Sequence, residues 1–307
     1  MSLTLTFLGT GAAVPTLERN VSSLAISREG EMLLFDCGEG TQRQMMRYGV
    51  GFSFDEIFFT HYHSDHLLGV TGLIRTLGLQ ARTEPMKLYG PKGAAKVLGA
   101  TLDVGIERTK FPVEIVEVAP GDRLARGDYD IAVFPTDHRA DTVGYALVEH
   151  DRLGRFEPER AKELGIPEGP AWGRLHRGET VELPDGRTVG PEGLVGEPRP
   201  GRTVVYTGDT RPHEAVIDAA RHADLLIHEA TFGHDEIDRA IGTGHSTALE
   251  AAEIARAAEV RRLVLTHISA RYSREAPELL AEAQAVFSET VVARDGLVIE
   301  IGFPGQA

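Results

Sequence analysis

The 307-residue sequence lacks several features that mark particular classes of protein. Its one cysteine, Cys37, excludes an internal disulfide and favours a reducing compartment. No apolar run approaches the ~18 residues needed to span a membrane, and residues 1–15 lack the basic segment of a secretory signal. The 46 acidic residues outnumber the 32 basic residues, so the net charge is −14. This charge excludes a generally basic surface for nucleic acid but not a local basic patch. These absences predict a cytoplasmic protein without membrane association.

The composition is otherwise globular, with 42% hydrophobic and 25% charged residues. Short apolar or alternating runs predict many strands with helical patterns between them. The predicted strands span residues 3–7, 24–26, 32–35, 56–60, 86–89, 115–118, 131–134, 143–148, 204–207, 225–227, 263–266 and 297–301. Ser246 is predicted to start one amphipathic helix, and residues 277–287 form another. This order suggests an α/β fold, a four-layer αββα sandwich that makes a single domain over residues 1–307. The spacing alone does not distinguish this sandwich from other layered α/β folds.

Residues 150–200 interrupt this pattern with 7 of the 16 prolines and 9 of the 34 glycines. An irregular stretch of this length is uncommon in a compact domain unless it is functional or disordered. Residues 158–164 are predicted to be helical, and Pro184-Asp185-Gly186 predicts the turn of a hairpin. We interpret the segment as an inserted, flexible arm that protrudes from the domain. The alternative is a structureless linker.

Candidate metal ligands begin directly after the apolar strand 56–60, with His61, His63, Asp65 and His66. Three imidazoles and a carboxylate within six residues form a nitrogen and oxygen ligand set that suits zinc. His61 and His63 lie two apart on an extended segment, so they point to one side and can share an ion. Asp65 and His66 follow where the chain turns into a helix, so they can reach a second ion. A surface loop with several histidines is the alternative.

Three more candidate ligands each follow a later predicted strand: His138, Asp209 and His267. Loops at strand ends, held by a rigid scaffold, are common positions for metal ligands. A lone histidine there would more often be structural, but their joint occurrence favours ligands. Asp209 is the natural bridge between two ions, because one carboxylate can give an oxygen to each.

The motif His61-Tyr62-His63-Ser64-Asp65-His66 is the signature of the metallo-β-lactamase superfamily, and the later candidate ligands fall in its usual order. Within that superfamily the chain closely resembles the ribonuclease Z family, tRNA 3′-processing endonucleases, in its short form. The resemblance runs nearly end to end and is carried by residues 7–11, 15–20, 35–39, 228–232, 245–247 and 265–272, together with the glycine-rich insertion. It implies the metallo-β-lactamase fold and an endoribonuclease that removes the 3′ trailer from precursor tRNA. The tRNA would keep a 3′-hydroxyl and the trailer a 5′-phosphate.

The resemblance also implies two Zn²⁺ ions per chain. One zinc would take His61, His63, His138 and Asp209, and the other would take Asp65, His66, Asp209 and His267. Asp65 would also orient or deprotonate the attacking water.

Two further residues gain catalytic roles from the resemblance. His245 would contact the scissile phosphate and protonate the leaving oxygen, and Glu229 would orient its ring by a hydrogen bond. The alternative for His245 is an incidental position beside a helix that Ser246 caps. Asp36 is a plausible hydrogen-bond partner for a metal-binding histidine.

Five residues are predicted to contact RNA. Arg271 could clamp a phosphate with its planar guanidinium, although a surface ion pair is the plainer alternative. Arg19 and Asn20 match the family's loop that senses nucleotides beyond the cleavage point. The inserted arm matches the family's tRNA-binding exosite, where Arg174 and Arg177 supply local basic charge. The resemblance implies a homodimer, in which the arm of one subunit reaches RNA on the other's active site.

Two other functions compete with tRNA 3′ processing. The first is a metallo-β-lactamase-fold hydrolase of a small phosphodiester, thioester or lactam, and the second is an inactive RNA-binding or scaffold protein. The intact ligand set disfavours the inactive protein. An insertion of about 50 residues favours a macromolecular substrate over a small one.

Overall fold

The computed structural model describes residues 2–106, 108–272 and 274–303. The chain divides into two compact units. The larger unit is the chain up to Val148 together with Thr203–Gly302, and the smaller unit is Glu149–Arg202 with Phe303. Each strand predicted from the sequence lies on an observed strand.

A seven-stranded sheet forms one half of the larger unit, in the order β18-β1-β3-β4-β5-β6-β7. Its strands are β1 (Leu3–Gly9), β3 (Ser23–Arg28), β4 (Glu31–Phe35), β5 (Glu56–Phe58), β6 (Met86–Gly90), β7 (Val113–Glu117) and β18 (Val298–Glu300). From β4 to β7 the neighbours are parallel, which requires long crossover connections, usually helical. The helices in these connections are α1 (Thr41–Arg47), α2 (Ser64–Leu67), α3 (Gly69–Leu79) and α4 (Ala94–Leu102).

A second seven-stranded sheet has the order β17-β15-β14-β13-β10-β9-β8. Its strands are β8 (Arg123–Ala125), β9 (Tyr129–Pro135), β10 (Val143–Glu149), β13 (Thr203–Tyr206), β14 (Leu225–Glu229), β15 (Leu263–Thr266) and β17 (Thr290–Val292). The strands from β13 to β17 are parallel. Their connections contain α7 (Glu214–Ala220), α8 (Ile237–Thr243), α9 (Ala248–Ala257) and α10 (Pro277–Gln284). The short strands β2 (Gly11–Ala12) and β16 (Ile268–Ser269) pair with each other.

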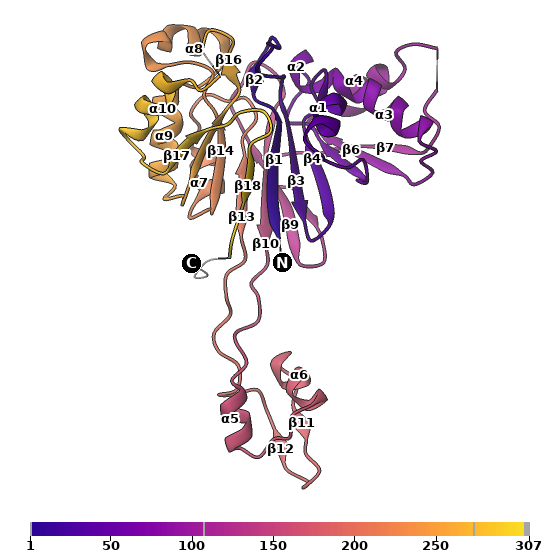
Figure 1. Cartoon of the computed structure of the whole chain (residues 1–307), viewed down its shortest axis with the longest axis vertical. Helices are drawn as coiled ribbons and strands as arrows, with labels where there is room; N and C mark the ends of the chain where they lie inside the picture. The colour runs from indigo at the N-terminus through magenta and orange to yellow at the C-terminus, as the bar shows by residue number, and fades with distance from the viewer. Residues whose placement is uncertain (1, 107, 273, 304–307) are drawn as a thin grey trace. The chain divides into compact units, whose positions relative to one another are not determined.

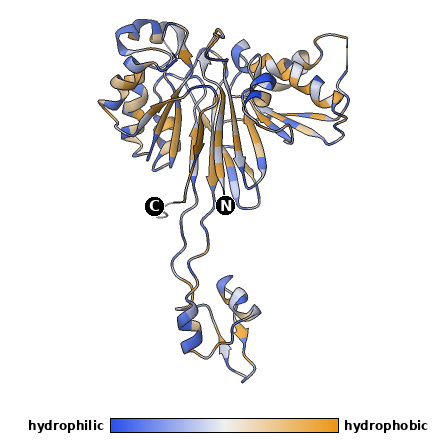
Figure 2. Cartoon of the chain, viewed as in Figure 1, coloured by the Kyte–Doolittle hydropathy of each residue, from blue (hydrophilic) through white to orange (hydrophobic). Residues whose placement is uncertain are grey.

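Three apolar layers hold the larger unit together, as the predicted αββα sandwich requires. In the central layer, Phe35 and Phe58 of the first sheet meet the ring of Tyr145 from the second, with centroids 5.8 and 5.5 Å away. A second layer packs the first sheet on α1, α3 and α4, and a third packs the other sheet on α7, α9 and α10. Figure 1 shows the helices on the outer sides of the two sheets, and Figure 2 shows that hydrophobic residues concentrate in the strands. No helix among the described residues has the length and apolar character to span a bilayer.

The helix predicted after Ser246 is α9, but Ser246 is not its N-cap. Thr247 takes that position: its Oγ1 accepts the Glu250 backbone N–H at 3.2 Å, and the Glu250 carboxylate accepts the Thr247 N–H at 2.9 Å. The Ser246 hydroxyl instead donates to the Thr210 carbonyl at 2.6 Å. Ser246 therefore ties the loop before α9 to the loop after β13.

The smaller unit has secondary structure and a core of its own. It contains α5 (Pro158–Glu163), α6 (Pro170–His176) and the hairpin β11 (Val181–Glu182) to β12 (Thr188–Val189), so the predicted helix and hairpin are both present. Its buried apolar side chains are Ala161, Ile166, Leu175, Val181, Leu183 and Leu194. Trp172 packs against this cluster and donates its indole N–H to the Ile166 carbonyl at 3.2 Å. A structureless linker would have no such core.

Candidate metal centre and active site

Strand ends of the larger unit supply a cluster of histidines and carboxylates. His61 follows β5, His138 follows β9, Asp209 follows β13, and His267 follows β15, while Glu229 is the last residue of β14. The carboxyl ends of parallel strands open at one edge of a sheet, where ligand sites commonly form. The fold therefore brings together residues that lie more than 200 positions apart in the chain.

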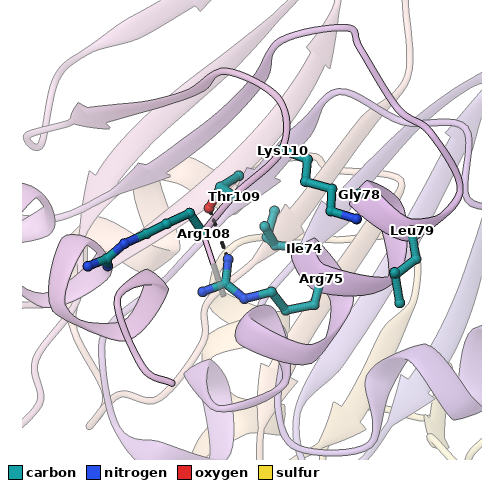
Figure 3. Close-up of a pocket in the computed structure, with 7 residues that line it drawn as sticks. All are labelled: Ile74, Arg75, Gly78, Leu79, Arg108, Thr109 and Lys110. Atoms are coloured by element: carbon teal, nitrogen blue, oxygen red, sulfur yellow. Dashed lines mark hydrogen bonds between the residues drawn. The ribbon is translucent and has the colours of Figure 1, made fainter. Parts of the chain in front are cut away.

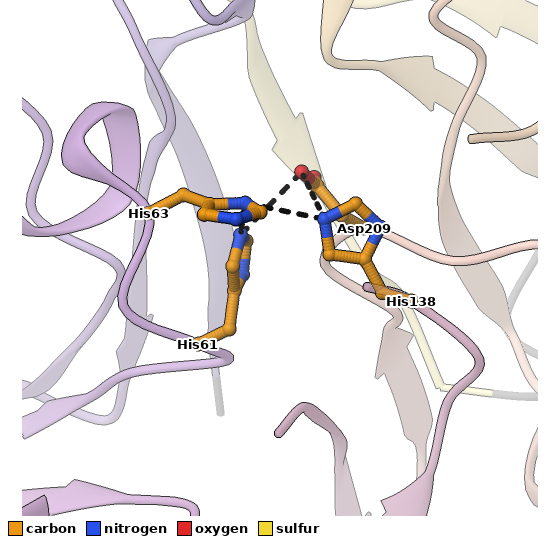
Figure 4. Close-up of side chains that lie close together, drawn as sticks. All are labelled: His61, His63, His138 and Asp209. Atoms are coloured by element: carbon orange, nitrogen blue, oxygen red, sulfur yellow. Dashed lines mark hydrogen bonds and ion pairs between the residues drawn. The ribbon is translucent and has the colours of Figure 1, made fainter. Parts of the chain in front are cut away.

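The first group of candidate ligands consists of His61, His63, His138 and Asp209, whose ligand atoms all lie within 4.8 Å of one another. The Nδ1 atom of His63 lies 3.0 Å from Nε2 of His61 and 3.2 Å from Nε2 of His138. The Oδ2 atom of Asp209 lies 3.6 Å from His61 Nε2 and 3.9 Å from His138 Nε2. Figure 4 shows the three rings and the carboxylate converging on one point.

The second group consists of Asp65, His66 and His267, also with ligand atoms within 4.8 Å of one another. Asp65 Oδ2 lies 3.2 Å from His267 Nε2 and 3.6 Å from His66 Nε2. Asp209 reaches this group through its other oxygen, because Oδ1 lies 3.3 Å from both His66 Nε2 and His267 Nε2. The two oxygens of one carboxylate thus face two different groups of candidate ligands.

Hydrogen bonds at Nδ1 hold four of the imidazoles in position. The pairs are His61 with the Thr60 hydroxyl (3.1 Å), His66 with Asp36 (2.8 Å), His138 with the Gly244 carbonyl (2.7 Å) and His267 with the Thr231 hydroxyl (2.9 Å). The Gly244 carbonyl can only accept, so His138 donates from Nδ1 and presents the lone pair of Nε2. The same arrangement in the other three rings is the usual one for metal-binding histidines. The predicted hydrogen bond to the Asp36 carboxylate is present, whereas the roles of Thr60, Thr231 and Gly244 were missed because no local pattern marks them.

Three non-glycine residues beside the cluster have left-handed backbone: Ala13 (φ 58°), Asp36 (φ 53°) and His267 (φ 56°). Such conformations cost ~1–3 kcal/mol each and cluster at functional sites. Each of the three makes a hydrogen bond that holds part of the cluster in position. The Ala13 N–H donates to Asp65 Oδ2 at 2.8 Å, which holds that carboxylate in place.

The electrostatics of the cluster favour a cation. Burial lowers the pKa of His66, but the carboxylates of Asp209 and Asp36 raise it well above its usual range. Burial opposes ionisation of Asp209, but the surrounding histidines hold the pKa of its carboxyl well below its usual range. Moreover, His66 Nε2 and Asp209 Oδ1 are buried atoms without a hydrogen-bond partner. Converging lone pairs and unpaired buried atoms are what a set of metal ligands presents, so the residues fit divalent metal ions.

His245 lies beside the two groups and is held by Glu229. Its Nδ1 is 2.8 Å from Glu229 Oε1, the hydrogen bond predicted from the sequence. The fully buried Glu229 carboxylate also accepts the Thr210 N–H at 3.0 Å and the Thr231 hydroxyl at 2.8 Å. Burial lowers the pKa of His245, but the Glu229 carboxylate raises it to about 9. Since His245 also comes within 4.8 Å of ligand atoms on Asp209 and His267, its geometry permits either a proton donor or a metal ligand.

Arg19, one of the residues predicted to contact RNA, has a buried side chain in the structure. Arg19 is only 2% exposed, and its guanidinium donates to the Thr10 hydroxyl at 2.7 Å and to the Ala293 carbonyl at 2.6 Å. This arginine therefore holds its own loop in place. Asn20 is half-buried, and its backbone N–H donates to Asp295 at 2.7 Å.

The other predicted RNA-contacting arginines are exposed. The Arg271 side chain is 53% exposed, and its Nη1 lies 4.0 Å from Glu236, at the limit of an ion pair. In the smaller unit, Arg174 and Arg177 both pair with Glu179, at 2.9 and 3.1 Å. Exposed ion pairs of this kind are weak, so these guanidinium groups can exchange partners.

A separate cavity of about 230 Å³ lies between α3 and the segment before β7 (Figure 3). It is lined by Ile74, Arg75, Gly78, Leu79, Arg108, Thr109 and Lys110. Arg75 is held by the Thr109 hydroxyl at 3.2 Å and by the Leu102 carbonyl at 2.5 Å. Among the residues that the structure describes, the lining contains neither a carboxylate nor an imidazole, so they offer no metal ligand here.

Comparisons with known proteins show what this chain is similar to. A family described as "Beta-lactamase superfamily domain" matches residues 181–268, and one described as "Anti-Pycsar protein Apyc1" matches residues 3–154. Ribonuclease Z of Gemmatimonas aurantiaca is 60% identical over 98% of this chain and 96% of its own length. Ribonuclease Z of Haloferax volcanii is 53% identical over 99% and 96%. The crystal structure of human tRNase Z, short form, has a TM-score of 0.71 at 28% identity, covering 98% of this chain and 100% of that one. The metallo-β-lactamase fold protein YhfI of Bacillus subtilis, at 21% identity, has a TM-score of 0.70 and shares the fold.

Proposed function

The chain belongs to the ribonuclease Z family of endoribonucleases, and from this premise we propose that it removes the 3′ trailer from precursor tRNA with two bound zinc ions. Hydrolysis breaks the bond between phosphorus and O3′, leaving a 3′-hydroxyl on the tRNA and a 5′-phosphate on the trailer. The observation that carries the proposal is the position of the Asp209 carboxylate, whose two oxygens face two separate groups of candidate ligands. One carboxylate can therefore serve two ions.

The first zinc would be held by His61, His63, His138 and Asp209, and the second by Asp65, His66, Asp209 and His267. A mixed set of imidazoles and carboxylates suits zinc. A pair of such ions supplies electrostatic stabilisation to the attacking and leaving oxygens of an in-line displacement at phosphorus.

Two side chains carry the protons in this proposal. Asp65, fixed by the Ala13 N–H, orients the attacking water and accepts its proton as the water oxygen bonds to phosphorus. His245 donates a proton to O3′ as the bond between phosphorus and O3′ breaks. Glu229 orients the His245 ring through the 2.8 Å hydrogen bond and favours its protonated form.

Recognition of the tRNA is assigned to other parts of the chain. The exposed Arg174 and Arg177 of the smaller unit would contact the tRNA body, and Arg271 a phosphate near the cleavage point. Phosphate contacts position an RNA without reading its sequence. In line with the family resemblance, the working form is a homodimer. The single cysteine supports a cytoplasmic location.

The test is incubation with a precursor tRNA that carries a 3′ extension, beside a small chromogenic phosphodiester, followed by mapping of both RNA ends. We expect one cut at the 3′ end of the tRNA and a 5′-phosphate on the trailer. Removal of metal ions by a chelator should abolish the activity, and added zinc should restore it. Turnover of the small phosphodiester with no cleavage of the precursor would contradict the proposal and favour a small-molecule hydrolase.

A further inference from the structure

A cavity of about 520 Å³ lies next to the candidate metal centre and has no role in the proposal above. It is lined by Asp137, His138, Arg139, Arg211, Pro212, Ile241, Gly244 and Glu250. His138 is one of the candidate zinc ligands, and Gly244 is both its hydrogen-bond acceptor and the neighbour of His245. The cavity therefore adjoins the position where the scissile phosphate would lie.

The two arginines of this cavity differ in their partners. Arg211 is committed to the protein, because its Nη1 donates to Glu250 at 2.8 Å and to the His245 carbonyl. Arg139 is exposed and makes no side-chain hydrogen bond or ion pair with any residue that the structure describes. The aliphatic part of its side chain passes close to Gly244, where an added Cβ would lie 3.1 Å from Arg139 Cγ. The guanidinium of Arg139 is thus available to bind an anion.

The lining also offers an apolar surface. Ile241, on α8, is 57% exposed, and Pro212 lines the same cavity. Apolar and cationic groups side by side suit an unpaired nucleotide, since its base has a flat apolar face and its phosphate is an anion. The volume lies within the range of small-ligand sites.

We propose that this cavity binds the nucleotide next to the scissile phosphate, with Arg139 contacting that nucleotide's phosphate and Ile241 and Pro212 supporting its base or sugar. The inference rests on the proposed function. A guanidinium fork matches two oxygens of a phosphate. The Asp137 carboxylate lines the same cavity and repels the phosphate, so it helps to confine the phosphate to the side of Arg139.

The experiment compares the wild type with Arg139→Ala, Arg139→Lys and Asp137→Asn. Arg256→Ala is the matched control, because Arg256 is likewise exposed and unpaired among the described residues, in the last turn of α9. Binding of the 3′-extended precursor is measured over a series of salt concentrations, together with kcat, KM and zinc content. The small phosphodiester serves as a second substrate.

We expect Arg139→Ala to weaken precursor binding about tenfold, as loss of a charged hydrogen bond does, and to raise KM with little change in kcat. The salt dependence should fall by about 0.7 in slope, the value for one phosphate contact on a single strand. Arg139→Lys should restore the slope but only part of the affinity, and Asp137→Asn should tighten binding. Zinc content and turnover of the small phosphodiester should stay at the wild-type level.

Equal binding and salt slope for Arg139→Ala and Arg256→Ala would overturn the inference, as would a matching loss of zinc in Arg139→Ala. Failure of the proposed function has a different signature. In that case the wild type itself does not cleave the precursor, whatever the four variants do to binding.

Discussion

The strand-end loops of the larger unit and the smaller unit Glu149–Arg202 differ in how far their function can be derived from their residues. The seven candidate ligands are residue types with a defined chemistry, and the fold brings all of them into two groups that share Asp209. The smaller unit has a defined fold, but four of its exposed arginines, Arg160, Arg174, Arg177 and Arg187, are paired with acidic neighbours. A set of candidate metal ligands is thus visible in a chain alone, whereas an RNA-binding surface is defined only against its partner.

The largest effect is expected at the shared ligand. Asp209→Ala should abolish hydrolysis of both the precursor tRNA and a small phosphodiester, because both candidate metal positions lose an oxygen. Asp218→Ala, which changes an exposed surface carboxylate, is the control. Rate measurements on both substrates with elemental analysis check this. Two zinc ions per chain and normal turnover in Asp209→Ala would show that this carboxylate is no ligand.

The next effect separates proton transfer from metal binding. His245→Ala should lower kcat about 10²–10⁴-fold, the usual contribution of a positioned general acid, while the zinc content stays at the wild-type level. Single-turnover rates and elemental analysis of the same sample are compared. Because His245 also reaches Asp209 and His267, a fall in zinc alongside activity would place it among the ligands instead.

A variant without the smaller unit's core tests the contrast between the two regions. The Gly196 N–H donates to the Arg155 carbonyl at 2.8 Å, so a short Gly/Ser linker can replace the chain between these residues. Closing a shorter loop changes the free energy of unfolding only slightly. Zinc content and hydrolysis of the small phosphodiester should persist, while precursor affinity falls about 10–100-fold, as expected for the loss of several phosphate contacts. Equal losses on both substrates would mean that the segment supports the metal centre.

The smallest effect is expected from individual arginines of that unit. The double variant Arg174→Ala/Arg177→Ala should weaken precursor binding a few-fold, because each guanidinium must first leave Glu179. Arg160→Ala, which breaks a comparable exposed pair with Glu163 in the same unit, should leave binding unchanged. Titrations at several salt concentrations distinguish the two, and identical slopes would remove Arg174 and Arg177 from the RNA-binding surface.

Sequence reasoning predicted the layers, the strands and the candidate ligands, because each rests on a local pattern: an apolar run, then a polar residue at its end. It missed contacts that exist only after distant loops meet, such as the hydroxyl of Thr231 on His267. It also did not show that Arg19 is buried, since nothing local reveals that the Ala293 and Arg274 carbonyls accept hydrogen bonds from its guanidinium. Ser246 and Thr247 are both residue types that commonly cap helices, but the Ser246 hydroxyl is hydrogen-bonded to the Thr210 carbonyl instead.

The central claim is that the two groups of ligands form one centre with two metal positions that share Asp209. The most direct measurement is the zinc content of the wild-type chain after exhaustive dialysis, by elemental analysis against a quantitative protein concentration. We predict two zinc ions per chain. A chain that retains one zinc or none while fully active on precursor tRNA would contradict the shared centre.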